Sequence, residues 1–311
     1  HPAIPDLHVV SRLDPGRQPR NQNQHGNSPA MSRLNFVIAG AQRSATTSLK
    51  AAMSEHPDVG FLGNQREQLV HGGEYVGFPF TSPFASKSLL GVQEDGAVYD
   101  SISAHAKPAR YLGTKWPYFM IFPHIACNLR QHLPDLRVIF ILRNPVDCLW
   151  SSFRKQYDGN DVAEDFRAFV HHGLEAIEGA THAEERSRWN GMLFADDSPA
   201  LAIDRGCYYP QLMNFVLLFG WSRLRVLDYQ AFSREPDKVV NGVFGWMGLE
   251  RLEDLQSTKT RHNAVSEHAS AEVARAAMDA ETRARLDAFY APSSRLLCQT
   301  LGWDVDAWTA P

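Results

Sequence analysis

The segment Phe36–Leu49, FVIAGAQRSATTSL, joins a short apolar run to a cluster of small, hydroxylated and basic residues. This pattern predicts a strand, a loop that holds Gly40 and Arg43, and a helix that begins at Thr46. The first N–H groups of a helix, its dipole and nearby hydroxyls bind anions, and Arg43 would add a fixed positive charge. The segment therefore predicts a phosphate or sulfate site, although a tight turn closed by a Ser or Thr cap would produce the same pattern.

A second candidate anion site follows the run Arg137–Leu142, RVIFIL, which is typical of a central parallel strand. Arg143 comes at the carboxyl end of that strand, where open α/β sheets bind ligands. Ser151 lies eight residues further on, in a helix predicted to begin at Pro145. A guanidinium and a hydroxyl could together hold a second phosphate. The alternative is that Arg143 closes the strand end through a carboxylate such as Asp147.

The first segment does not have the pattern of a nucleoside triphosphatase. The phosphate loop of those proteins needs G-x-x-x-x-G-K-[ST]. The loop after Ala39 lacks both the second glycine and the Lys-Ser/Thr pair. The sequence therefore disfavours an ATPase or a GTPase.

Short apolar runs alternate with amphipathic helical segments from Leu34 onward. Such alternation predicts an α/β fold with a P-loop-like parallel sheet, flanked by helices on both faces, in a single domain. The strands are expected at residues 34–39, 110–114, 137–142 and 224–227. The helices are expected at residues 46–55, 119–132, from 145 onward, 163–177, 209–219, 236–247 and 281–290, where Pro292 should interrupt the last helix before it resumes at 294–301.

The first 32 residues differ from the rest of the chain. The stretch from Asp14 to Ala30 is rich in Pro, Gln, Asn, Arg and Gly and holds almost no large apolar side chains. We expect residues 1–32 to be a flexible N-terminal extension, a linker or a tag, and residues 33–311 to form the folded domain.

The composition excludes several classes of protein. The chain has 311 residues and a formal net charge of −4, which gives no support for binding nucleic acid through a basic surface. The four cysteines lack C-x-x-C spacing and a nearby histidine, so we expect reduced thiols rather than disulfides or a zinc site. No apolar run approaches the ~18 residues that cross a bilayer. We therefore expect a cytoplasmic protein with no transmembrane segment and no metal ion.

Four motifs, in the family's order, resemble those of the PAPS-dependent sulfotransferases, closest to the heparan sulfate sulfotransferase-like branch and its bacterial relatives. GAQRSATTSL is similar to the family's 5′-phosphosulfate loop, and LRNPVDCLWSS is similar to its 3′-phosphate strand and helix. GTKWPYF, residues Gly113–Phe119, resembles the family's lysine-proline-tyrosine stretch. NQREQ, residues Asn64–Gln68, resembles its Lys-Glu segment, with Arg66 in place of the lysine. The resemblance extends from about residue 34 to residue 303.

The resemblance implies that the chain binds PAPS and releases 3′-phosphoadenosine 5′-phosphate. Arg43 and Lys115 would act at the 5′-phosphosulfate, while Arg143 and Ser151 would hold the 3′-phosphate. Without the resemblance, Lys115 would be an exposed lysine at a strand end, and the stretch STKTRHN would be a solvated loop. The residues implied in nucleotide binding are Gly40, Gln42, Arg43, Ser44, Ala45, Thr46, Thr47, Ser48, Arg143, Ser151, Lys259 and Arg261.

The acceptor must lose a proton as it attacks, so a base has to lie near the sulfuryl group. The resemblance places Glu67 in that role, and a carboxylate enclosed among bound anions is a stronger base than a solvated one. His71 and Glu74 are close in the sequence and remain alternative bases. A solvated loop glutamate is the ordinary alternative for Glu67.

We expect an enzyme that moves the sulfuryl group to a hydroxyl or amine of a small-molecule, carbohydrate or carrier-protein-bound acceptor, with no nucleic-acid partner. The net charge of −4 argues weakly against a polyanionic acceptor of the heparan type. Arg205 and Gly206 could shape the acceptor cleft or form only a tight turn before a helix, and aromatic residues such as Tyr118 and Tyr208 are expected mostly in the core. Two alternatives stay open: a P-loop-like kinase of a small molecule, and a catalytically inactive nucleotide-binding module.

Overall fold

The computed structural model describes residues 34–62, 70–71, 74–75, 109–156, 162–180, 198–259 and 277–309. All of these residues belong to one compact unit, Ser32–Pro311. The expected extension, residues 1–32, lies outside the described ranges, so its character stays a prediction.

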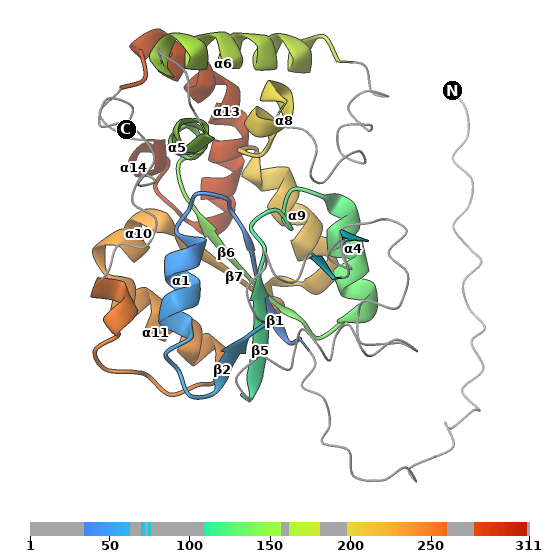
Figure 1. Ribbon diagram of the computed structural model, residues 1–311, viewed down its shortest axis with the longest axis vertical. Helices are drawn as coiled ribbons and strands as arrows, with labels where there is room; N and C mark the ends of the chain where they lie inside the picture. The colour runs from blue at the N-terminus through green and yellow to red at the C-terminus, as the bar shows by residue number, and fades with distance from the viewer. Residues whose placement is uncertain are drawn as a thin grey trace, which may run out of the picture. The chain divides into compact units, whose positions relative to one another are not determined.

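The described strands form a parallel five-stranded sheet in the order β2-β5-β1-β6-β7 (Figure 1). Its members are β1 Phe36–Gly40, β2 Val59–Phe61, β5 Tyr111–Lys115, β6 Arg137–Leu142 and β7 Leu224–Asp228. A separate antiparallel pair consists of β3 Val70–His71 and β4 Glu74–Tyr75. β1 lies at the centre of the sheet and is buried over its whole length. The predicted parallel sheet is confirmed.

Helices cover both faces of this sheet, as predicted (Figure 1). One face carries α1 Thr46–Met53, α10 Tyr229–Arg234 and α11 Pro236–Met247, and the other carries α4 Pro123–His132 and α9 Tyr208–Phe219. Four more helices pack together beyond the end of the sheet where β6 leads onward (Figure 1). They are α5 Pro145–Gln156, α6 Val162–Glu178, α8 Pro199–Asp204 and α13 Ala280–Leu301, and α14 Val305–Thr309 follows.

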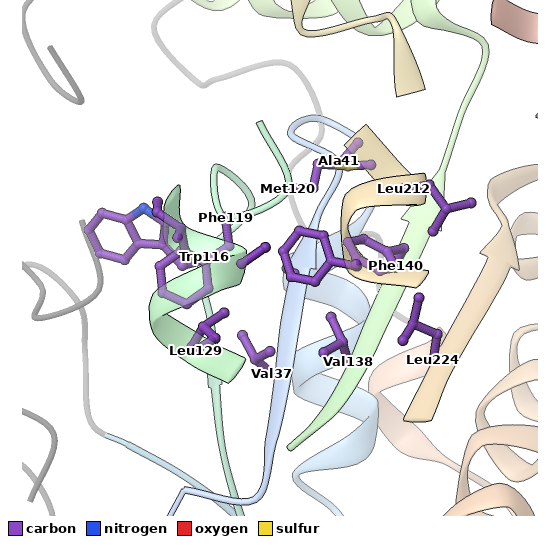
Figure 2. Packing of buried hydrophobic residues seen from close by; sticks show 14 of the residues in the cluster. Val37, Ala41, Trp116, Phe119, Met120, Leu129, Val138, Phe140, Leu212 and Leu224 are labelled. Atoms are coloured by element: carbon purple, nitrogen blue, oxygen red, sulfur yellow. The ribbon is translucent and has the colours of Figure 1, made fainter. Parts of the chain in front are cut away.

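Strand residues alternate between two apolar clusters because successive side chains of a strand point to opposite faces. Val37, Val138 and Phe140 belong to the cluster beneath α4 and α9, and Figure 2 shows them beside side chains of both helices. Ile38 and Ile139 belong to the cluster beneath α1 and α11. Burial on both faces thus explains why the sequence of β6 is almost wholly apolar.

Two glycines in the central strands allow unusually close packing. A Cβ atom on Gly113 of β5 would collide with the ring of Phe36, and one on Gly40 would collide with Met120 Sδ. Figure 2 shows Met120 next to Ala41, just beyond β1. Gly40 therefore permits the segment after β5 to approach the end of β1.

The interruption predicted at Pro292 is wrong. α13 runs from Ala280 to Leu301 with Pro292 inside it. Proline removes one backbone hydrogen bond, but Tyr290 and Leu297 are buried on either side of it and anchor both halves of the helix. Tertiary packing therefore carries the helix through the proline.

Other boundaries differ by a few residues. The strand at 137–142 and the helix at 236–247 match their predictions, and α11 ends at Gly248, whose φ of 72° lies in the left-handed region. α4 begins at Pro123 rather than at residue 119, because residues 117–121 form turns and proline suits a first helical turn. The short elements β2, α8, α10 and α14 were not predicted, because few residues give little periodic signal.

We expect Gly113→Ala to lower the free energy of unfolding by about 1–3 kcal/mol, because its methyl group overpacks the core against Phe36. Gly245→Ala is the matched control. Gly245 is exposed in α11 with nothing within 4 Å of a Cβ position, so the substitution should stabilise by up to about 1 kcal/mol through helix propensity. Urea denaturation followed by circular dichroism measures both effects. Wild-type stability of Gly113→Ala would contradict the packing described.

Candidate anion-binding site

Three segments that carry candidate functional residues meet at the carboxyl edge of the sheet, because parallel strands end on the same side. The loop with Gln42 and Arg43 follows β1, Lys115 ends β5, and Arg143 follows β6. β1 leads into α1 on one face, whereas β5 leads into α4 on the other (Figure 1). Open α/β sheets bind ligands where successive connections diverge in this way.

The loop between β1 and α1 has an unusual backbone. Arg43 and Ala45 have φ angles of 62° and 63°, and this left-handed region costs a non-glycine residue on the order of 1 kcal/mol or more. Ser44 is fully buried, and its Oγ lies 3.2 Å from Cys148 Sγ on α5. The side chain of Ser44 thus holds the loop from inside, and its hydroxyl faces the core.

No side chain caps the start of α1. The N-cap position is Ala45, and the first turn contains no acidic residue. The alternative interpretation from the sequence, a turn closed by a Ser or Thr cap, is therefore wrong. Lys115 lies beside this helix start, and its Nζ donates to Thr47 Oγ1 at 3.2 Å. An anion placed here would meet both the positive end of the helix dipole and a fixed cation.

Arg43 connects the two segments that the sequence singled out. Its Nε donates to Ser151 Oγ at 3.2 Å, so the loop after β1 touches α5. Burial lowers the pKa of Arg43; the thiol of Cys148 opposes this shift, while the positive charges of Arg143 and Arg154 add to it. The structure therefore brings Arg43, Ser151 and the charge of Arg143 together.

Lys115 is half-buried rather than exposed. Burial is the main cause of its lowered pKa, followed by the positive charges of Lys50 and Lys155. No carboxylate among the described residues forms an ion pair with Lys115 or with Arg43. Both are cations held where their charge is unfavourable, so an anion is their natural partner.

Within the described part of the chain, the acidic partner of Arg143 is distant. Its guanidinium lies over the ring of Tyr229, 4.8 Å from the centroid, and its Nη2 is 3.9 Å from Asp147 Oδ2. Arg283 holds the same carboxylate more closely, with both Nη atoms 3.1 Å from Asp147 Oδ1. Arg143 is therefore not neutralised by Asp147, and its charge remains available to a ligand.

Asn144 is a residue of this site that sequence reasoning missed. Its Oδ1 accepts from the backbone N–H groups of Val146 and Asp147, at 2.9 and 3.3 Å, and so caps α5. Its Nδ2 donates to the carbonyl oxygen of Trp308 in α14 at 3.3 Å. A signal was present, because asparagine favours the N-cap position and Pro145 fits the first helical turn.

Lys259 does not join the other predicted site residues. It ends a short 3₁₀ turn, η3 Gln256–Lys259, and forms an ion pair with Asp254. Glu55 accepts hydrogen bonds from the backbone of this turn just beyond the carboxyl end of α1, whereas the anion-binding loop lies at the other end. Arg261, the other basic residue predicted to bind the nucleotide from this loop, lies outside the described residues.

The predicted base also lies outside the described residues. Nothing describes Glu67, and only the backbones of the alternatives, His71 and Glu74, are placed, paired across β3 and β4. Their roles stay predictions.

A small pocket borders the loop after β1. Gln42, Arg43 and Arg205 contribute polar side chains to it. Gln42 Nε2 donates to the Tyr118 hydroxyl at 2.5 Å, and Arg205 Nη1 donates to Gln42 Oε1 at 3.5 Å. Tyr208 is buried as expected, yet it too lines the pocket. The turn predicted at Arg205 therefore contributes to the site.

Three further observations concern the described part of the chain. The helices there are too short or too polar to cross a membrane. His, Cys, Asp and Glu residues in these ranges do not gather into a group of three or more that could hold a metal ion. The four cysteines are free thiols, as the spacing predicted.

We expect the affinity for adenosine 3′,5′-bisphosphate to fall as the pH rises, because deprotonation of Lys115 removes its charge. The lowered pKa of Lys115 starts this loss at a lower pH than for an ordinary lysine. In Lys115→Arg the guanidinium stays charged, so the decline should shift to higher pH. Calorimetry from neutral to alkaline pH, on both proteins, measures the difference. Coincident profiles would show that Lys115 does not contact the anion.

The chain is similar to known proteins both in sequence and in fold. The model of the sulfotransferase domain family matches residues 34–286. Mouse carbohydrate sulfotransferase 15 is 22% identical over 178 residues, which are 56% of this chain and 31% of that protein, so the match spans about a third of the relative's length. The crystal structure of a sulfotransferase from Alicyclobacillus acidocaldarius shares the fold, with a TM-score of 0.61 and 21% identity over 90% of this chain and 100% of that one. The chain belongs to the sulfotransferase family.

Proposed function

We propose that this chain moves the sulfuryl group of PAPS to a hydroxyl or amine of an acceptor. The hydrogen bond from Arg43 Nε to Ser151 Oγ supports this most directly. It sets the loop after β1 against the helix after β6, so the two anion-binding segments belong to one site. A ligand with two separate phosphates fits such a site better than a nucleoside triphosphate, whose phosphates form one chain.

The residues present fit the charge of this donor. Arg43, Lys115 and Arg143 are cationic, and the hydroxyls of Thr47 and Ser151 lie among them. Charge-assisted hydrogen bonds to anionic oxygens are the strong contacts that such side chains make. The uncapped start of α1 adds backbone dipoles of the same sign.

PAPS, when bound, supplies an activated sulfate on its 5′-phosphate. Arg43 and Lys115 would stabilise the negative charge that grows on that phosphate as its bond to the sulfuryl group breaks. Thr47 orients Lys115 by accepting its hydrogen bond, and Ser44 holds the loop in place. Arg143 and Ser151 would hold the 3′-phosphate and select against nucleotides that lack it. Burial and packing preorganise these groups, which is what transfer through a loose transition state requires.

We propose Glu67 as the base that takes the acceptor's proton, with His71 and Glu74 as alternatives. This assignment rests on the resemblance of residues 64–68 to the family's Lys-Glu segment. A side-chain base contributes roughly 10²–10⁴-fold to rates of this kind.

We propose a small-molecule, carbohydrate or carrier-bound acceptor. The mouse relative is by name a carbohydrate sulfotransferase, which favours a sugar hydroxyl among these. The pocket beside Gln42 and Arg43 is largely apolar, which favours an acceptor with an apolar part.

Adenosine 3′,5′-bisphosphate tests the donor assignment without knowledge of the acceptor. Arg43→Ala and Arg143→Ala should each weaken its binding by at least about tenfold, because each removes a charge-assisted contact. Arg223→Ala is the matched control, since Arg223 forms an exposed ion pair with Asp135 before β7, at the opposite edge of the sheet. ATP and AMP should bind more weakly than the bisphosphate. Wild-type affinity in both site variants would remove the assignment.

Glu67→Gln should keep the affinity for the bisphosphate and lose most of the turnover, by about 100-fold or more, because the amide cannot accept the proton. His71→Gln and Glu74→Gln, made in parallel, should turn over normally. Sulfate transfer from PAPS to a panel of alcohols, phenols and amines measures the rates. Near-normal turnover by Glu67→Gln would move the base to whichever parallel variant is inactive. Bisphosphate binding without transfer to any acceptor would instead indicate an inactive nucleotide-binding module.

A further inference from the structure

Polar and apolar side chains both line the pocket beside the loop after β1. Gln42, Arg43, Ser152 and Arg205 contribute the polar side chains. The apolar lining includes Ala41, Pro117, Met120, Ile121, Leu149 and Tyr208. Arg43 also contacts Ser151 in the anion-binding site. A molecule bound in this pocket would therefore lie next to an anion bound by Arg43.

Arg205 is an unsatisfied cation within this lining. Its Nε is buried and has no hydrogen-bond partner among the described residues. Its Nη1 makes one long contact, 3.5 Å to Gln42 Oε1. One face of the guanidinium is occupied, since Cζ lies 5.2 Å from the ring centroid of Tyr118. The N–H groups point along the edge of the guanidinium, where a hydrogen-bond acceptor would bind.

The backbone that carries Arg205 is held rigidly. Gln211 is buried, and its Nε2 donates to the carbonyl oxygens of Asp204 and Arg205 at 3.0 and 3.3 Å. A Cβ atom on Gly206 would lie 2.5 Å from the Tyr290 ring and 2.8 Å from Pro145 Cβ, so only glycine permits this turn. The Tyr290 hydroxyl donates to the carbonyl oxygen of Ile203 at 2.8 Å. A guanidinium on so fixed a turn is preorganised to bind.

We infer that Arg205 is the specificity-determining contact for the acceptor, and that the acceptor carries a carboxylate-like anionic group attached to an apolar body. This inference rests on the proposed sulfotransferase function. The apolar lining residues of the pocket would contact the body, and the N–H groups of Arg205 would bind the anion.

The contrast with other arginines supports an anionic group rather than a neutral one. Arg283 and Arg223 each pair with an aspartate. Arg205 has no carboxylate partner in the described ranges, although it lines the pocket together with a second arginine, Arg43. A planar guanidinium with a free edge matches a carboxylate through two parallel hydrogen bonds, whereas a neutral amide or hydroxyl leaves the charge uncompensated.

Binding to the wild type with saturating adenosine 3′,5′-bisphosphate tests this inference. The probes are hydroxycarboxylates with aliphatic and aromatic bodies, each paired with its neutral amide. Calorimetry should detect binding of at least one acid and at least about tenfold weaker binding of its amide. In Arg205→Ala the preference for the acid should disappear while the bisphosphate affinity stays at the wild-type value. Arg205→Lys should recover part of the preference for the acid, because lysine restores the charge but not the paired N–H donors of the guanidinium. Arg223→Ala is the control and should behave like the wild type.

Each outcome bears on one proposal. Failure of the wild type to bind the bisphosphate would remove the proposed function itself. Normal bisphosphate binding with no acid bound, or with acids and amides bound equally, would overturn only the role of Arg205. Loss of bisphosphate affinity in Arg205→Ala would also overturn it, by making Arg205 a donor contact. Thermal unfolding identifies a variant that fails to fold, and in that case Arg205→Gln, which keeps a hydrogen-bonding head, replaces Arg205→Ala.

Discussion

Arg43 reaches from the loop after β1 to Ser151 on α5, and this contact joins segments 108 residues apart in the chain. The adjacent pair of β1 and β6 at the centre of the sheet makes the contact possible, because it fixes where both following segments begin. The left-handed backbone at Arg43 and Ala45 then turns the guanidinium toward α5 and the chain into α1. The end of β6 also sets the position of Arg143, whereas Lys115 comes from the end of β5, the other neighbour of β1.

The site gathers cations at a cost in stability. Burial and neighbouring positive charges lower the pKa values of Arg43, Lys115 and Arg154, so each of these charges is less favourable than in water. The surrounding structure offsets this cost through the apolar clusters on both faces of the sheet. Within the described ranges, neither Arg43 nor Lys115 forms an ion pair with a carboxylate, so binding of an anion beside them would stabilise the folded protein.

The sequence predicted the framework of the fold well. Apolar runs such as RVIFIL carry a strong signal, so the type and place of that strand could be predicted directly. The prediction failed at Pro292, where buried neighbours outweigh the local preference of proline. The short elements β2, α8, α10 and α14 gave too little pattern to recognise.

The candidate site was predicted in part. Arg43, Lys115 and Arg143 could be found because each comes at or just after the end of a strand, and parallel strands end at one edge. The inward direction of Ser44, the cap made by Asn144 and the unpaired edge of Arg205 could not be found in this way. Each depends on contacts between residues far apart in the sequence, and no local spacing encodes them. Lys259, which the resemblance implied in nucleotide binding, pairs with the neighbouring Asp254, and its role stays a prediction.

The side-chain amide of Asn144 connects the start of α5 to the short helix α14. It faces two ways, toward the first turn of α5 and toward the carbonyl of Trp308. Any event that detaches the last short helix therefore also deprives the turn beside Arg143 of a fixed anchor. One amide thus joins α14 to the start of α5, next to Arg143.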